Sequence, residues 1–412
     1  MNIAVIGSGG REHAIVWKLQ QSERAEKDFC IPGNAGTHNN VELKVNDFSG
    51  IKRFCEDNDV KLIFVGPEQP LNEGITDYFS DTEIMVFGPD KRASQLESSK
   101  IFAKEFMIKY GVKTANYERF DNSEKAKEYC RELSGKCVIK FDGLAAGKGV
   151  FVCNTLKEVE DALLIINTTY GADARILIEE LLTGQELSIL AFTDGAEYQL
   201  LLSSQDHKQL LDNDKGPNTG GMGAYCPVDF CTEKMLAQIK KEIIEPTIQG
   251  LKQENFNYHG VLYFGLMITP EGVSVLEYNV RMGDPETEVV MPALKSDLLE
   301  LVLACFKDGL QEFNLEFNPG YFVDVVLASG GYPSQYAKGY PIDIPLEVDG
   351  AIFHAGSKLD NGEIVTSGGR VLNVVAEGKD LNTAIKNAYD LVSRVSFKDM
   401  YYRTDIGKSK RK

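Results

Sequence analysis

Residues 273–297 read VSVLEYNVRMGDPETEVVMPALKSD. Within this stretch Glu277, Asn279 and Arg281 alternate along one predicted strand, and side chains two residues apart on a strand share a face. Carboxylate and amide oxygens are ligands that Mg²⁺ accepts when substrate phosphates complete its shell, and an arginine neutralises charge on a transferring phosphoryl group. The stretch therefore predicts a metal–nucleotide site. A polar edge strand that faces water is the alternative that this motif alone leaves open.

The composition is that of a globular protein with an acidic surface. The chain has 412 residues, of which 43% are hydrophobic, which is enough for roughly two to four domains with apolar cores. The 61 Asp and Glu residues against 44 Lys and Arg give a formal net charge of −17, which repels nucleic acid and anionic membrane surfaces. We therefore expect no nucleic-acid partner and no membrane partner, and we interpret the basic run KSKRK at residues 408–412 as a solvated tail.

The cysteine pattern and the chain start indicate a reducing compartment. Eight cysteines are scattered without a C-x-x-C pair, so their spacing indicates neither a zinc site nor a disulfide framework. The first residues, MNIAVIGSGG, lack the pattern of a signal peptide, and no apolar run approaches the ~20 residues that a membrane span needs. These features predict a cytoplasmic protein.

The order of apolar runs predicts several structural units. The first hundred residues alternate short apolar runs with amphipathic stretches, which implies parallel βαβ units with a ligand crevice at the carboxyl ends of the strands. Farther along, the runs GVLYFGLMIT and VSVLEYNV predict a strand pair that follows a long helix at residues 233–255. From about residue 319 the chain is strand-rich and closes with a helix at residues 381–395.

The motif GSGGREHA at residues 7–14 follows the first strand and opens a helix. Backbone N–H groups and the helix dipole can receive a phosphate at such a place. The dinucleotide fingerprint is matched only in part, because Glu12 replaces its third glycine and no clear acidic residue ends the second strand. We therefore disfavour a nicotinamide dinucleotide and expect the phosphate of a smaller ligand at Gly9, Gly10 and Arg11.

The motif GLAAGKGV at residues 143–150 is glycine-rich but is not a Walker loop, because no Ser or Thr follows Lys148 and the segment lies between two predicted strands. We interpret it as a flap that folds over ATP phosphates. Gly147 and Lys148 belong to the flap, and Lys140 contributes from the end of the preceding strand. A plain hairpin with a surface lysine is the alternative.

The motif IEELLTGQE at residues 178–186 places Glu179, Leu182 and Glu186 at a predicted hinge between two sub-domains. Backbone groups at such a hinge can pair with the edge of adenine, and a carboxylate can bind ribose hydroxyls. An ordinary exposed turn with a core leucine would give a similar sequence.

Together these elements resemble the ATP-grasp fold, with Lys100 in an entry helix, Lys140 on a strand, a flap, a hinge and a metal strand. The ordered motifs GSGGREHA, PGNAGT, VGPEQPL, LESSKIFAKEFM, DGLAAGKGV, QDHK, GPNTGGMGAY, EYNVRMGDPET and SGGYP resemble those of the glycinamide ribonucleotide synthetase family over essentially the whole chain. The resemblance implies an α/β and α+β multidomain protein. Its parts are an N-terminal parallel βαβ substrate domain (1–100), an ATP-grasp core (101–318) with a small lid sub-domain at about 119–189, and a strand-rich C-terminal domain (319–412).

The resemblance also implies an activity, namely the ATP-dependent ligation of glycine to 5-phosphoribosylamine through glycyl phosphate, with Mg²⁺ or Mn²⁺ as cofactor and a monomeric enzyme. The residues that match the family motifs then take these roles: Glu277 and Asn279 bind the metal; Arg281 and Asp284 are catalytic; Lys100, Lys140, Gly147, Lys148, Glu179, Leu182 and Glu186 bind ATP; Gly9, Gly10, Arg11, Glu68, Asp206, Lys208, Asn218 and Gly220 bind substrate.

The sequence departs from the family pattern at Phe141, Gln209 and Met282, which concerns flap packing and one cationic contact. The strand GVLYFGLMIT lacks the third metal carboxylate that is common in the superfamily, so metal binding rests on the two ligands of the metal strand and on phosphates. Two alternatives stay open: another ATP-grasp carboxylate–amine ligase or carboxylase of nucleotide metabolism, and a non-catalytic nucleotide-binding protein.

Overall fold

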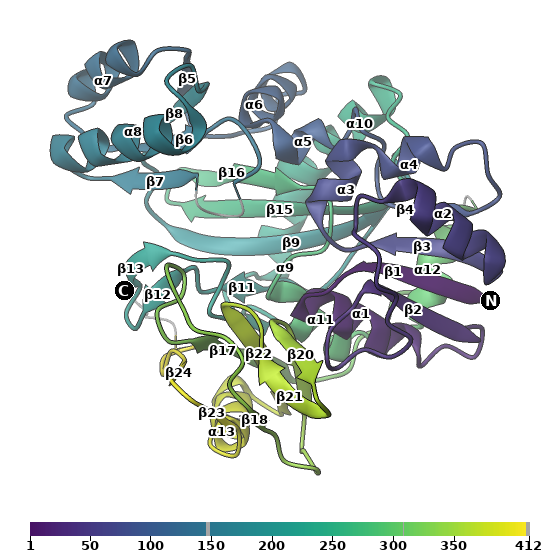
Figure 1. The fold of residues 1–412 in the computed structure, drawn as a ribbon. Helices are drawn as coiled ribbons and strands as arrows, with labels where there is room; N and C mark the ends of the chain where they lie inside the picture. Colours follow the sequence, from purple (N-terminus) through teal and green to yellow (C-terminus); the bar gives the residue numbers. More distant parts are fainter. Residues whose placement is uncertain (146–148, 308, 409–412) are drawn as a thin grey trace.

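The structure is a computed structural model that describes residues 1–145, 149–307 and 309–408 (Figure 1). Its first unit is a parallel sheet in the order β2-β1-β3-β4, as the alternation of apolar runs predicts. The central strand β1 is buried almost throughout because both of its faces are apolar. The bounds of these elements are β1 Asn2–Gly7, α1 Gly10–Leu19, β2 Lys27–Pro32, α2 Phe48–Asp57, β3 Val60–Val65, α3 Glu68–Glu73, α4 Ile75–Tyr78 and β4 Met85–Phe87.

The entry helix is divided in two. The sequence predicts one helix from LESSK to Gly111, whereas the structure has α5 (Gln95–Ser98) and α6 (Lys100–Lys109). Ser99 between them has an extended backbone, and its hydroxyl accepts a hydrogen bond from the amide of Phe102. This is an N-cap, so it starts a new helix. The break makes Lys100 the first residue of α6.

A small sheet with the order β5-β8-β6-β7 forms a separate lid, covered by α7 and α8, at the upper left of Figure 1. It has an apolar core of its own, in which α7 and α8 pack against the sheet. The next strand, β9, pairs with the central sheet instead. The lid sheet therefore ends at Glu180, before the predicted boundary at about 189. The bounds are β5 Tyr117–Phe120, α7 Ser123–Glu132, β6 Cys137–Phe141, β7 Val150–Cys153, α8 Leu156–Tyr170 and β8 Ile176–Glu180.

The central sheet is antiparallel, in the order β10-β9-β15-β16, and it contains the predicted strand pair. The long helix predicted at 233–255 is continuous but contains a π-helical turn at Lys240–Ile244. The turn directly precedes Pro246, which has no N–H to continue the regular ladder. The bounds are β9 Gln185–Thr193, β10 Tyr198–Leu200, α9 Glu233–Ile239, α10 Glu245–Gln253, β15 Gly260–Thr269, β16 Gly272–Asn279, α11 Glu286–Ala293 and α12 Leu298–Ala304.

The C-terminal sheet has the order β11-β14-β17-β22-β19, and β24 also pairs with β17. Its first two strands come from the middle of the chain, so the sheet crosses the predicted boundary at 318/319. The bounds are β11 Gln205–Asp206, β14 Gly223–Cys226, β17 Tyr321–Ser329, β19 Ala351–His354, β22 Arg370–Gly378, α13 Leu381–Val392 and β24 Met400–Tyr401, with two-stranded pairs formed by β12 Gln209–Leu211 and β13 Lys215–Asn218, β18 Ile342–Asp343 and β23 Ser396–Phe397, and β20 Ser357–Asp360 and β21 Glu363–Thr366.

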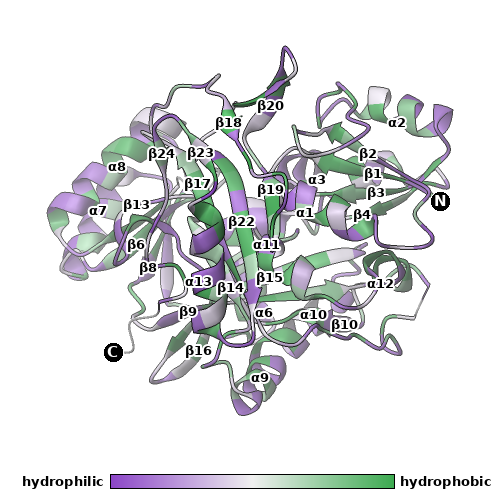
Figure 2. Cartoon of the chain, turned by 90° about the horizontal axis from the view of Figure 1, so that it is seen from below, coloured by the Kyte–Doolittle hydropathy of each residue, from purple (hydrophilic) through white to green (hydrophobic). Residues whose placement is uncertain are grey.

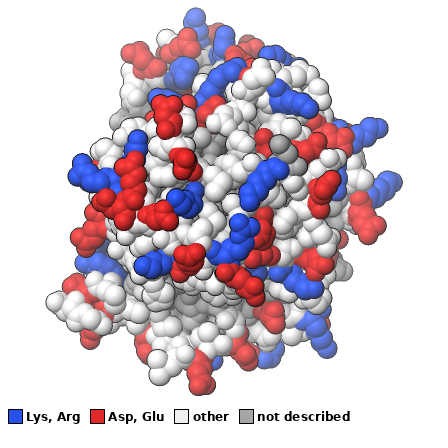
Figure 3. Space-filling view, turned by 90° about the vertical axis from the view of Figure 1, so that its right-hand side faces the viewer, with Lys and Arg blue, Asp and Glu red and all other residues white. Residues whose placement is uncertain are grey.

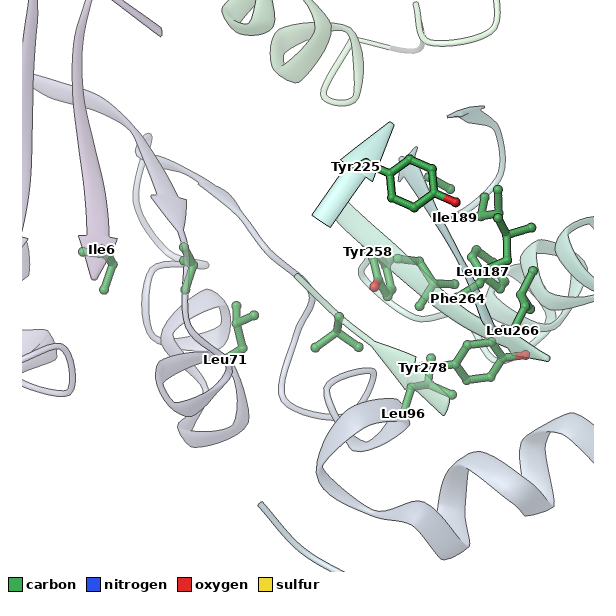
Figure 4. Packing of buried hydrophobic residues seen from close by; sticks show 14 of the residues in the cluster. Ile6, Leu71, Leu96, Leu187, Ile189, Tyr225, Tyr258, Phe264, Leu266 and Tyr278 are labelled. Carbon is green, nitrogen blue, oxygen red and sulfur yellow. The ribbon is translucent and has the colours of Figure 1, made fainter. Parts of the chain in front are cut away.

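The N-terminal and central sheets share one apolar core. Leu96 of α5 lies beside Tyr278 of β16, and Phe264 and Leu187 pack on the same side of the central sheet (Figure 4). Truncation of a buried aromatic side chain such as Phe264 to alanine costs about 3–5 kcal/mol in comparable cores. In the ribbon coloured by hydropathy, apolar strands lie inside, and the helices turn polar residues outward (Figure 2).

The surface carries charges of both signs. On the face seen in Figure 3, acidic and basic side chains are interspersed and neither sign forms a continuous field. Within the described part of the chain, no helix has the length and apolarity needed to cross a membrane.

Candidate active site

A cavity of about 400 Å³ lies where the N-terminal unit, the entry helix, the lid, the central sheet and the C-terminal sheet meet. Most of the residues that the motifs single out line this one cavity. They are Arg11, Glu68, Lys100, Asp206, Lys208, Gly220, Glu277, Asn279, Arg281 and Asp284. A larger groove of about 850 Å³ lies between α13 and β22, but none of the predicted site residues lines it. Side-chain chemistry rather than size therefore identifies the site.

The strand β16, which carries the predicted metal ligands and is called the metal strand below, contains a β-bulge. Glu277 lies opposite Gly265 and Val275 lies opposite Leu266, so Leu276 is the extra residue of β16. A bulged residue is left out of the regular ladder, and the carbonyl oxygen of Leu276 accepts a hydrogen bond from Nζ of Lys140 at 3.0 Å instead. The bulge thus ties a lid lysine to the strand that carries the predicted metal ligands.

Glu277 and Asn279 offer two hard oxygen donors. Burial raises the pKa of Glu277, but the ammonium groups of Lys208 and Lys140 outweigh burial and hold that pKa below its usual range. The carboxylate is therefore ionised at neutral pH. In the described residues no three His, Cys, Asp or Glu side chains converge as a metal cage. The two oxygens fit an ion that takes its remaining ligands from phosphates and water, which is how proteins bind Mg²⁺.

Arg281 is held by two carboxylates. Its Nη2 donates to Oε1 of Glu97 at 2.8 Å, and its Nε lies 3.6 Å from Glu68. Burial lowers the pKa of Arg281, but Glu97 and Glu68 more than compensate and raise it above its usual range. Sequence reasoning missed Glu97. The available signal was its position in LESSK, two residues before Ser99, which caps the entry helix.

Lys100 and Lys140 join the lid to the body of the protein. Nζ of Lys100, on the entry helix, donates to the carbonyl of Gly143 in the lid at 2.9 Å. Burial lowers the pKa of Lys100, although Glu277 acts in the opposite direction. Both ammonium groups therefore lie where the lid meets the strand that carries the predicted metal ligands. Gly147 and Lys148 of the predicted flap lie outside the described residues.

The hinge motif has the predicted position but a different arrangement of carboxylates. The link at residues 181–184 joins the lid sheet to the central sheet and contains Leu182. Glu179 is only 1% exposed and forms ion pairs with Lys140 at 2.9 Å and Lys104 at 3.2 Å. It borders a small cavity of about 30 Å³ behind the main one. Glu179 thus pairs with two lysines, and the binding of ribose by a carboxylate of this motif stays a prediction.

The segment QDHK contributes a further cationic group, the ammonium of Lys208. Nζ of Lys208 lies 2.8 Å from Asp206 and 3.3 Å from Glu186. Burial lowers the pKa of Lys208, but these carboxylates raise it well above its usual range. Asn218 pairs with Gln209 in a two-stranded ribbon and does not line the cavity, whereas Gly220 does.

The residues Gly9, Gly10 and Arg11 of the first glycine-rich loop lie in three different surroundings. The amide of Gly9 donates to Glu12 at 2.6 Å, and Gly9 itself lines a second cavity of about 550 Å³. Gly10 is buried against Glu288 and Asn373, leaving no room for a side chain. Arg11 pairs with Glu12 at 2.6 Å and faces the first cavity. This placement contradicts the prediction of one phosphate cradle made by all three residues, because Glu12 already satisfies the Gly9 amide.

The three residues that depart from the family motifs make these contacts, one through its side chain and two through backbone oxygens. Phe141 stacks on Tyr170 with ring centroids 3.8 Å apart, which fixes the base of the flap. The carbonyl of Met282 accepts hydrogen bonds from Arg11 and Arg281 at 3.1 Å each. The backbone oxygen of Gln209 accepts from Arg403 at 3.0 Å.

Two further residues of the cavity were not predicted. Glu286 lies buried at the start of α11 and accepts a hydrogen bond from Ser188 at 2.8 Å. Arg370, which begins β22, forms an ion pair with Asp284 at 2.9 Å. Glu286 belongs to the motif EYNVRMGDPET but was given no role there, whereas Arg370 is brought to the cavity by long-range packing of the C-terminal sheet.

Family models for three domains of phosphoribosylglycinamide synthetase match the chain in order: the N domain at residues 1–97, the ATP-grasp (A) domain at 98–287 and the C domain at 322–409. The chain belongs to the phosphoribosylglycinamide synthetase family. The resemblance drawn from the motifs is thereby confirmed, as is the three-part architecture with an ATP-grasp core.

Individual relatives agree with the family assignment. The chain is 46% identical to a phosphoribosylamine–glycine ligase from Clostridium acetobutylicum, over 100% of both chains. A crystal structure of phosphoribosylamine–glycine ligase from Thermotoga maritima matches with a TM-score of 0.85 and 36% identity, covering 98% of this chain and 100% of the other. A biotin carboxylase from Campylobacter jejuni matches with a TM-score of 0.72 at 14% identity, covering 98% of this chain and 94% of the other, and so shares the fold.

Proposed function

We propose that this phosphoribosylglycinamide synthetase family member joins glycine to 5-phosphoribosylamine, consuming ATP and releasing ADP and phosphate. The observation that carries the proposal is the convergence of Glu277, Asn279, Arg281 and the two lysines Lys100 and Lys140 at one cavity and its rim. Such a set of metal ligands and cations suits phosphoryl transfer, which depends on positioning and charge stabilisation.

The metal ligands and the ATP contacts follow from this geometry. Glu277 and Asn279 would hold Mg²⁺ or Mn²⁺, and the ion would neutralise charge on the phosphates. Lys100 and Lys140 bind phosphate oxygens from the entry helix and the lid. Gly147 and Lys148 contribute to ATP binding and the hinge with Leu182 takes the adenine, while Glu179 and Glu186 fix Lys140 and Lys208 respectively.

The first step activates a carboxylate. An oxygen of the glycine carboxylate attacks the γ-phosphorus of ATP, the bond to the bridging oxygen breaks, and ADP leaves. Arg281 and Lys208 face the cavity with raised pKa values, so they stay charged and stabilise the transferring phosphoryl group. The product, glycyl phosphate, is an acylating agent, so the enzyme needs no nucleophile of its own.

The second step forms the amide. The amine of phosphoribosylamine attacks the acyl carbon, phosphate leaves with the electron pair of the broken C–O bond, and the amine gives up one proton. Asp284 lies at the edge of the first cavity and takes that proton. Glu68 and Arg11 line the same cavity, where Glu68 contacts the ribose hydroxyls and Arg11 contacts the phosphate of phosphoribosylamine. Asp206, Asn218 and Gly220 order the facing loop.

We also propose that the enzyme acts as a monomer in the cytoplasm. One chain supplies all the residues of the cavity just described, and all eight cysteines are free thiols, as in proteins of a reducing compartment. The domain boundaries near residues 100 and 318 remain part of this proposal.

The activity is tested by measuring ADP release and glycinamide ribonucleotide formation with glycine and 5-phosphoribosylamine, alongside other carboxylate and amine pairs. We expect ADP and product in equal amounts with the first pair only. Equal or faster turnover with a different carboxylate or amine would assign the chain to another ATP-grasp reaction. A lack of ATP binding at millimolar Mg²⁺ would favour a non-catalytic role.

A further inference from the structure

Two cavities meet at a pair of residues. The first, of about 400 Å³, holds the metal strand and the cations, and the second, of about 550 Å³, lies between the first loop and the C-terminal unit. Asp284 and Arg370 line both cavities, and no other described residue does. A reaction that joins a phosphorylated acid in one cavity to an amine in the other must occur beside this pair.

The guanidinium of Arg370 is held by contacts of one nitrogen, Nη1. Its Nη1 pairs with Asp284 at 2.9 Å and also donates to the carbonyl oxygens of Gly220 and Asp284. Among the residues that the structure describes, no acceptor engages its Nε or Nη2. The side chain is 19% exposed, and the space it borders is that of the two cavities. These two donors therefore have no protein acceptor among the described residues, on a side chain that lines both cavities.

The surroundings keep the guanidinium in this position. A Cβ atom on Gly220 would lie 3.0 Å from Cζ of Arg370, so a side chain at this position would require the guanidinium to shift by a few tenths of an ångström. Two further carboxyl groups, Glu288 and Asp324, lie behind it, and burial raises the pKa of each well above its usual range. Among the described residues Asp284 is the one carboxylate that forms an ion pair with Arg370, and Nε and Nη2 of the guanidinium stay available to a further anion.

Resting on the proposed function, we propose that Arg370 is a substrate-contacting residue whose Nε and Nη2 bind an anionic oxygen of a reacting substrate at the boundary of the two cavities. An arginine presents paired N–H donors that match carboxylate and phosphate geometry. That oxygen belongs either to the carboxylate of glycine, with its acyl phosphate, or to the phosphate of phosphoribosylamine. In both cases the ion pair with Asp284 holds the proton acceptor beside the amine.

The test compares Arg370→Lys and Arg370→Met with a matched control. Arg403 is also a buried arginine of the C-terminal unit, paired with Asp214 and Asp405, but it lines neither cavity. Arg403→Lys therefore reports the effect of losing a buried guanidinium alone. For each variant we measure the melting temperature, the KM of each substrate, kcat, and the ratio of ADP to glycinamide ribonucleotide formed.

We expect Arg370→Met to raise the KM of one anionic substrate by roughly 10- to 100-fold, the usual effect of losing a charge-assisted contact, with the lysine variant intermediate and the KM of ATP little changed. A rise for glycine identifies the carboxylate, and a rise for phosphoribosylamine identifies the sugar phosphate. A ratio of ADP to product above that of the wild type also supports the assignment, because activated glycine then goes uncaptured.

Substrate constants that match the wild type, or that move only as they do in Arg403→Lys, would overturn the assignment. Calorimetry with glycine in the presence of ADP, and with ribose 5-phosphate, provides a readout without turnover. Weaker binding of one of these ligands to Arg370→Met supports the contact even if the wild type ligates a different pair of substrates. Unchanged binding of both rejects it. A wild-type enzyme inactive with glycine and phosphoribosylamine contradicts the proposed function alone.

Discussion

Glu97 and Arg281 are 184 residues apart in sequence and 2.8 Å apart in the fold. The second oxygen of Glu97 accepts the amide hydrogen of Val280, also at 2.8 Å. One carboxylate therefore fixes both the guanidinium and the backbone at the end of the metal strand. Asn279 adjoins both contacts, so Glu97 is placed to orient the metal ligand as well as the arginine.

Glu97→Gln should lower kcat by about 10- to 100-fold while the fold is kept, because a charge-assisted pair becomes a neutral hydrogen bond. Steady-state kinetics and a melting curve measure the two effects. Glu105→Gln, which breaks an exposed pair with Arg119, is the control and should leave both unchanged. Equal kinetics for the two variants would show that Glu97 has only a structural role.

Glu277→Gln and Asn279→Ala should each reduce turnover by orders of magnitude, since each removes an oxygen ligand of the metal. The rate should be measured as a function of Mg²⁺ concentration. Excess Mg²⁺ should partly rescue the weaker lesion. Wild-type rates for both variants at limiting Mg²⁺ would show that the metal is bound elsewhere.

Lys100→Met and Lys140→Met should weaken ATP binding, because both ammonium groups lie where the lid meets the metal strand, the place proposed for the phosphates. Titration calorimetry with ATP measures this directly. Lys109→Met is a suitable control, since Lys109 is on the same helix as Lys100 but is exposed and pairs with Glu254. Unchanged ATP affinity in both test variants would exclude this placement of the phosphates.

Arg11→Ala should raise the KM of phosphoribosylamine and barely change those of ATP and glycine. A charge-assisted contact to a substrate is worth about 1.5–3 kcal/mol, or roughly one to two decades in affinity. Kinetics with each substrate varied in turn, together with an NAD titration, gives the measurement. A defect confined to ATP, or micromolar binding of NAD, would contradict our assignment of this residue.

The free energy of unfolding should fall as the pH is lowered from about 6.5 toward 4. Burial, assisted by the neighbouring His354, lowers the pKa of His13 to about 3, and burial lowers that of His354 to about 4. In the unfolded chain both protonate near pH 6.5, so over this range the unfolded state binds more protons and is favoured. Each histidine contributes at most about 1.4 kcal/mol per pH unit.

Denaturant unfolding at several pH values measures this slope. His13→Gln, which keeps an acceptor for the amide of His354, should reduce the slope by the share of one histidine. The exposed-surface variant Glu105→Gln should leave it unchanged. An unaltered slope in His13→Gln would mean that other groups cause the acid sensitivity.

Local sequence patterns predicted the parts of the site that lie on one element. Glu277 and Asn279 share a strand face, as periodicity predicts, and Lys100 lies on the predicted entry helix. Arg281 was predicted on the same strand, but β16 ends at Asn279, so Arg281 reaches the cavity from the segment that follows the strand. Patterns could not show that Glu179 pairs with both Lys104 and Lys140. The first ion pair depends on how the lid meets the entry helix, and the second depends on which strands are neighbours within the lid sheet. Glu97 and Arg370 were missed because long-range packing brings them to the site. The contact of Glu12 with the Gly9 amide is local instead, since Glu12 lies at the third position of α1 as in a capping box, and this signal was not recognised.

The sheet that β14 shares with β17 has a consequence for recombining this protein with others. A crossover at residue 318 would separate Ala224 from its partner Asp324 and leave β11 and β14 as an unpaired edge. The loop that carries Asp206 and Lys208 would lose its support at the same time. The C-terminal part therefore cannot be exchanged on its own. A chimaera that retains activity should exchange residues 205–226 together with the C-terminal part.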